Sequence, residues 1–239
     1  ERGWHRDHNG NSCAKSDHSL DVSHTTQQTQ FITVWKMPVT TLKFAAIFKD
    51  CAQAEHLAQQ YRGQLFVDER AASRELPIAA LVTASTDDLA GFLAATDAGA
   101  YLIYERVIKP RSVPDDPNAA PSIPGAPVNL PGFIGLFPLI AHPDLGHTDA
   151  DRYWRDQHAP LALQVHEAMS HYRQLSIVHR FHGPDLDGIA LCGFDSLLDL
   201  RERFYATEAG REAIAKDISQ FADTAKSPRR MIVAETLYG

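Results

Sequence analysis

The chain has 239 residues, of which 44% are hydrophobic and 22% are charged, close to the averages of soluble globular proteins. This length suffices for one large or two small domains. The net charge of −7 argues against binding to nucleic acid, which depends on clustered cations, and no run of 18 apolar residues predicts a membrane span. Cys13, Cys51 and Cys192 are too far apart to suggest a disulfide framework or a CxxC metal site, so we expect a cytoplasmic protein.

Residues 1–36 are expected to form a flexible tail. They are rich in Ser, Thr, Gln, Asn and His and contain few aliphatic side chains, so they cannot bury enough surface to offset the entropy lost on ordering. The four histidines in this segment are irregularly spaced, which favours a solvated tail over a metal site.

Residues 37–108 read as a βαββαβ unit. Hydrophobic alternation predicts strands at 42–48, 65–67, 78–84 and 101–108, and helices are expected at 51–61 and 88–95. Seven of the fourteen prolines follow in residues 109–132, where they disfavour both a helix and a central strand, and we interpret this segment as a linker.

Residues 133–239 repeat the same order of elements. Strands are expected at 133–141, 172–181, 188–195 and 230–237. Thr148 and Asp149 are predicted to cap the first helix, and Ser196 to cap a helical stretch over 197–221 with a break near Gly210. Two such units predict an α+β fold of tandem ferredoxin-like units, in which two antiparallel sheets cover each other and helices cover their outer faces.

The first helix of the second unit carries the main candidate residue. At 100° per residue, Trp154, His158, Leu161 and Val165 lie on one face, so the histidine falls in an apolar stripe. Pro160 lacks an N–H group and clashes with the carbonyl four residues earlier, so we expect the helix to bend or restart there. A bend beside an inward-facing imidazole predicts a cavity.

The strand over 172–181 offers a second histidine. Leu175, Ile177, His179 and Phe181 alternate onto one face, and we expect this more apolar face to meet the helices, which would bring His179 close to His158. Two partly desolvated imidazoles are suited to proton transfer near neutral pH. The alternative is that each histidine is a core residue bonded to a backbone carbonyl.

Other titratable residues have ordinary explanations. Glu235 alternates in phase with the apolar residues of the last strand, and pairing with Arg229 or Arg230 explains an inward carboxylate there more simply than catalysis does. Glycine spacings match no phosphate-binding loop, and the histidines form no HxxxH or HExxH pattern. We therefore expect no metal and no other cofactor, including haem.

Several segments of the second unit resemble the EthD family. They are the run YWRDQHAPL at 153–161, the strand that begins at Tyr172, the segment 187–196 and the ending 227–235. The resemblance covers residues 133–239, and residues 38–108 look like a degenerate copy with His56 at the position of the motif. It implies a dimeric α/β barrel, here a pseudo-symmetric barrel within one chain that has one competent pocket.

The resemblance also implies a class of function. EthD-like and related barrels include proteins of oxidative degradation, cofactor-free oxygenation, polyketide cyclisation, and decarboxylation or dehydration of aromatic acids, so the fold does not select a reaction. We expect a lyase- or cyclase-like enzyme for a small hydrophobic, aromatic or polyketide-like substrate. Its catalytic residues would be His158 and His179, and its substrate-binding residues would be Trp154, Tyr172, Leu161 and Phe181.

Two other functions are compatible with the sequence. The protein could instead be an oxidoreductase, such as a monooxygenase, or an accessory protein of an oxidative degradation pathway. It could also be a binder of hydrophobic ligands without catalysis. We expect a homodimer that binds neither nucleic acid nor membranes.

Overall fold

The computed structural model describes residues 38–73, 76–96, 98–112 and 126–239. The predicted tail and most of the predicted linker therefore lie outside the described residues. Within the described ranges, no helix has the length and apolarity needed to cross a membrane.

The first half follows the predicted βαββαβ order. Asp50 and Asp88 each cap a helix, because their carboxylates accept hydrogen bonds from the amides of Ala52 and Gly91. The elements are β1 (Val39–Phe48), α1 (Cys51–Gln60), β2 (Gln64–Asp68), β3 (Ala80–Ala84), α2 (Leu89–Ala94) and β4 (Gly99–Lys109).

The second half repeats this order with a more elaborate set of helices. A short strand, β5 (Val128–Asn129), precedes it. The elements that follow are β6 (Phe133–Leu139), α3 (His147–Tyr153), η1 (Trp154–His158), α4 (Ala159–Val165), β7 (Met169–His182), β8 (Gly188–Phe194), α5 (Leu197–Glu202), α6 (Glu208–Ile218) and β9 (Met231–Leu237).

Two details of the predicted helices are wrong. Helix α3 begins at His147 without a side-chain cap, so Thr148 and Asp149 lie inside its first turn. The predicted break near Gly210 lies earlier, between α5 and α6, where the Thr207 hydroxyl accepts a hydrogen bond from the Gly210 amide and caps α6. The Thr207 cap sets the residue at which α6 begins. Gly210 lies in the first turn of this helix and does not end it.

The strands close into an eight-stranded antiparallel barrel. Each half has the ferredoxin-like order, β2-β3-β1-β4 in the first and β7-β8-β6-β9 in the second. The edge strand β4 pairs with β7, and β9 pairs with β2, so each half covers both edges of the other. The predicted α+β fold of two ferredoxin-like units is therefore confirmed, and both units belong to one chain.

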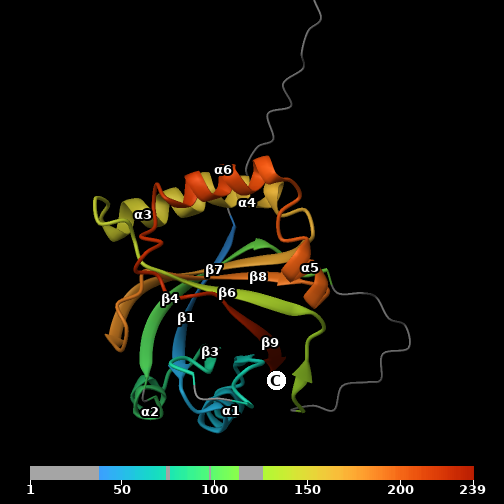
Figure 1. Cartoon of the computed structure of the whole chain (residues 1–239). Helices are drawn as coiled ribbons and strands as arrows, with labels where there is room; N and C mark the ends of the chain where they lie inside the picture. The colour runs from blue at the N-terminus through green and yellow to red at the C-terminus, as the bar shows by residue number, and fades with distance from the viewer. Residues whose placement is uncertain (1–37, 74–75, 97, 113–125) are drawn as a thin grey trace, which may run out of the picture. The chain divides into compact units, whose positions relative to one another are not determined.

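The barrel interior is an apolar core to which all eight strands contribute, with Ile47 and Leu81 from the first half and Leu136 and Val233 from the second. Helices cover the outer faces: α1 and α2 lie on the side of the first half, and α3, α4 and α6 lie on the side of the second (Figure 1). In the first half, the space under these helices is filled by side chains such as Phe92.

Glu235 points into the barrel and contacts two arginines. Its carboxylate oxygens lie 2.7 Å from guanidinium nitrogens of Arg173 and Arg111. The predicted pairing with Arg229 or Arg230 is wrong, because Glu235 faces the interior whereas the Arg230 guanidinium lies over the outer-face ring of Phe137. Arg229 is exposed.

The interior charges continue across the barrel as a chain. Arg173 also contacts Glu105 at 3.3 Å, and Glu105 lies 2.5 Å from the ammonium group of Lys43. The Arg173 Nε atom is buried and has no hydrogen-bond partner among the described residues. Strands of both halves are thus joined by buried ion pairs at one end of the barrel, beyond the apolar core.

Candidate active site

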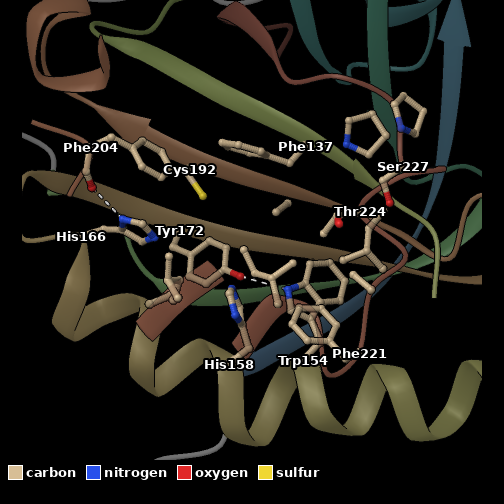
Figure 2. Close-up of a pocket in the computed structure, with 18 of the residues that line it drawn as sticks. Phe137, Trp154, His158, His166, Tyr172, Cys192, Phe204, Phe221, Thr224 and Ser227 are labelled. Atoms are coloured by element: carbon tan, nitrogen blue, oxygen red, sulfur yellow. Dashed lines mark hydrogen bonds between the residues drawn. The ribbon is translucent and has the colours of Figure 1, made fainter. Parts of the chain in front are cut away.

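A cavity of about 300 Å³ lies between the outer face of the second sheet and its helices. Phe137, Tyr172 and Cys192 line it from strands β6, β7 and β8, while Ile214 and Ile218 line it from α6. Figure 2 shows that its walls are mostly aromatic and aliphatic, with a few polar side chains among them. An apolar cavity of this size with a few polar groups is typical of a small-molecule site.

A π-helical turn places two side chains of the motif in this cavity. Residues Trp154–His158 form η1, in which the Ala159 amide bonds to the Trp154 carbonyl five residues earlier. Pro160 follows at the start of α4, where it cannot donate to the carbonyl of Asp156. The predicted restart of the helix at Pro160 is confirmed, and both Trp154 and His158 are buried against the cavity.

His158 is held by a carboxylate from another helix. Its Nδ1 atom lies 2.7 Å from Oδ2 of Asp217 on α6, and both side chains are about nine-tenths buried. Tyr153 donates to the other oxygen of Asp217 at 3.0 Å. A carboxylate on Nδ1 favours the tautomer with hydrogen on that atom and leaves a lone pair on Nε2, which has no partner among the described residues.

Tyr172 and Trp154 form a second polar group of the cavity. The Trp154 indole Nε1 donates to the Tyr172 hydroxyl at 3.2 Å, and the Gln174 amide donates to the same oxygen at 3.1 Å. Burial raises the pKa of Tyr172 far above its ordinary value, so the phenol stays protonated. Figure 2 shows that the Tyr172 hydroxyl and the His158 ring point toward the same part of the cavity.

Two further titratable side chains line the cavity and are held neutral. The Nδ1 atom of His166 donates a hydrogen bond to the Phe204 carbonyl at 2.7 Å, and burial lowers the pKa of His166, an effect that this hydrogen bond only partly offsets. Burial also raises the pKa of the Cys192 thiol to about 12, so this thiol is no nucleophile near neutral pH. No group of three or more His, Cys, Asp or Glu side chains among the described residues could hold a metal ion.

The segment that lines much of this cavity is similar in sequence to a known family. Residues 142–225 match the EthD domain family. The match includes Trp154, His158, Tyr172 and Asp217, so the hydrogen-bonded groups around His158 and Tyr172 lie in the segment that matches the EthD domain. The resemblance predicted from the YWRDQHAPL run is confirmed for this segment.

Solved structures that are similar to the chain include the following two. An anthrone oxidase-like protein is 12% identical, with a TM-score of 0.44 over 84% of this chain and 91% of that one. A chlorite dismutase from Candidatus Nitrospira defluvii is also 12% identical, with a TM-score of 0.38 over 85% of this chain and 93% of that one. The sequence matches no curated protein.

Of the predicted site residues, the EthD domain brings His158, Trp154 and Tyr172 together at the cavity. Leu161 is half-buried in the packing of α4 against the sheet and does not line the cavity. Phe181 packs against Phe44 of the first half, with ring centroids 6.3 Å apart, and is not part of the cavity lining.

The predicted placement of His179 beside His158 is wrong. The face of β7 that meets the helices carries Tyr172 and Gln174, whereas Leu175 and Ile177 face the barrel interior. A register shift between β4 and β7 lies just before His179, which is exposed. Seven residues of strand separate it from Tyr172, about 23 Å at 3.3 Å per residue, so its side chain cannot reach the cavity.

Three residues of the EthD domain were missed by the sequence analysis: Asp217, His166 and Gln174. The sequence could have indicated that Asp217 faces the cavity, because its spacing places it in the apolar helical stripe of Ile214, Ile218 and Phe221. A carboxylate in such a stripe needs a buried partner. The identity of that partner, 59 residues earlier in the chain, requires the tertiary structure.

Proposed function

We propose that this chain is an enzyme in which His158 acts as the general acid or base on a small aromatic or polyketide-like compound bound in the cavity. The observation that carries this proposal is the buried contact of 2.7 Å between Asp217 and Nδ1 of His158, beside an apolar cavity. A carboxylate that orients a histidine in this way also stabilises the imidazolium that forms when Nε2 takes a proton.

The chemistry follows from this arrangement. The Nε2 lone pair takes a proton from a carbon next to a carbonyl group, and the electrons of the C–H bond move to the carbonyl oxygen to form an enolate. The imidazolium then returns the proton to a carbon atom or to a departing hydroxyl group. Decarboxylation, dehydration and cyclisation of aromatic compounds all use such proton transfers, and the scheme invokes no cofactor.

The test is deuterium exchange, which reports proton abstraction whatever the later steps are. Bicyclic aromatic ketones with an acidic C–H group, beginning with 2-tetralone, are incubated in D₂O with the protein and followed by NMR. The wild-type protein should accelerate exchange over buffer, and His158→Ala should reduce this acceleration on the order of 100-fold or more. Asp217→Asn should also reduce it, because an amide can donate to Nδ1 and impose the wrong tautomer.

His179→Ala is the matched control, since it removes an exposed histidine of the same EthD domain outside the cavity. It should exchange as fast as the wild-type protein, and thermal unfolding checks that each variant is folded. Full exchange by a folded His158→Ala protein would refute the proposal. So would a panel of ketones and hydroxylated aromatic acids that bind without exchange or turnover, which would favour a ligand-binding protein instead.

A further inference from the structure

The Tyr172 hydroxyl oxygen already accepts two hydrogen bonds from donors that cannot reverse their roles. The indole Nε1 of Trp154, at 3.2 Å, is a donor only. The second donor is the Gln174 amide nitrogen at 3.1 Å. The first donor belongs to η1 and the second to β7, and Tyr172 is almost completely buried.

The orientation of the Gln174 amide is set by its other contacts. Its nitrogen also donates to the Trp154 carbonyl at 3.0 Å, and its oxygen faces the guanidinium group of Arg106 at 3.5 Å. Arg106 comes from β4 of the first half and forms a bidentate ion pair with Asp151 of α3. A flipped amide would place its NH₂ group against the arginine and two oxygens against each other, so Gln174 is a donor to Tyr172.

The hydrogen of the Tyr172 hydroxyl therefore has no acceptor among the described residues. The two donors use both lone pairs of the oxygen, so the O–H bond is free to turn toward the cavity that Tyr172 lines. A buried hydroxyl without an acceptor is unfavourable, and a ligand that supplied one would relieve this cost. Figure 2 shows the Tyr172 hydroxyl in the same region as the His158 ring.

We propose that Tyr172 donates a hydrogen bond to a carbonyl oxygen of the ligand, which places the neighbouring C–H group at His158. The ligand class is thus an aromatic ketone rather than a hydrocarbon. In the proton transfer, His158 removes the proton from carbon, and the hydrogen bond from Tyr172 stabilises the negative charge that develops on oxygen. The assignment of His158 as the base rests on the function proposed above, whereas the hydrogen bond from Tyr172 does not.

The test compares two ligands that differ only in this oxygen. The affinities of 2-tetralone and of the hydrocarbon tetralin are measured by equilibrium dialysis for the wild-type protein, Tyr172→Phe and Tyr104→Phe. Tyr104 is an exposed residue of β4, so its variant is the matched control for loss of a hydroxyl group. The preference for the ketone over the hydrocarbon should fall about three- to tenfold in Tyr172→Phe and stay unchanged in Tyr104→Phe.

Infrared spectroscopy of bound, ¹³C-carbonyl-labelled 2-tetralone provides a second readout. A hydrogen bond should shift the carbonyl band of the wild-type complex to lower wavenumber than in an apolar solvent, and Tyr172→Phe should abolish the shift. An unshifted band in the wild-type complex, or an unchanged ligand preference in Tyr172→Phe, would overturn the inference. Neither readout depends on turnover, so a failure of deuterium exchange alone would count against His158 and not against Tyr172.

Discussion

Replacing Glu235 with glutamine should destabilise the barrel strongly, because this carboxylate neutralises two arginines inside it. Glu235 lies 2.7 Å from both Arg173 and Arg111, and its side chain is only 2% exposed. Without it, Arg173 would keep one carboxylate among the described residues, Glu105 at 3.3 Å, and its hydrogen bond to the amide oxygen of Gln64 at 3.2 Å. Removing one partner of a buried ion pair typically costs about 3–5 kcal/mol.

We expect the lower end of this range, about 3 kcal/mol, because Glu105 remains and Arg111 is 20% exposed and can be hydrated. For a folded unit of this size, 1 kcal/mol lowers Tm by about 2–4 °C, so Glu235→Gln should lower it by about 6–12 °C. Thermal unfolding followed by circular dichroism measures this shift.

The matched control is Glu208→Gln, which removes an exposed carboxylate paired with Arg211 on α6. Exposed pairs on a helix contribute little, so Tm should not change measurably. If the two glutamine variants unfolded at the same temperature, the charges inside the barrel would contribute no more than surface charges, and our account of the interior would be wrong.

Two further predictions concern pH and the wall of the cavity. Burial lowers the pKa of His171 to about 3, and the charges of Arg111 and other nearby cations add to this effect. As the pH falls below about 6.5, only the unfolded chain takes up a proton at this histidine. The free energy of unfolding therefore decreases by up to about 1.4 kcal/mol per pH unit. Urea unfolding at pH 7, 6, 5 and 4 should therefore show a steeper loss of stability in the wild-type protein than in His171→Gln, and parallel curves would contradict the assignment. In Gly188→Ala, the new Cβ would lie 2.6 Å from Cζ3 of Trp154, so the indole must move. We therefore expect weaker binding of 2-tetralone and a decrease of about 1–3 kcal/mol in the free energy of unfolding. Gly146→Ala, where a Cβ meets no atom within 4 Å, should bind and unfold like the wild-type protein; equal behaviour of the two alanine variants would show that the indole does not shape the cavity.

Local patterns in the sequence were enough to predict the repeated βαββαβ order and the apolar stripe that contains Trp154 and His158. They also predicted the restart of the helix at Pro160. Each of these features depends on residues a few positions apart, where the periodicity of a helix or strand and the missing amide of proline act directly. The resemblance of the YWRDQHAPL run added the barrel and its EthD domain.

Only the tertiary structure decided which polar groups meet. Asp217 reaches His158 from a helix 59 residues further along the chain, and Gln174 is oriented by Arg106 of the other half. Alternation along β7 separates its residues into two faces but does not say which face meets the helices, since both faces of a barrel strand are buried. The expected placement of His179 beside His158 was therefore wrong, because the choice between barrel interior and outer surface is made by how the two sheets close on each other.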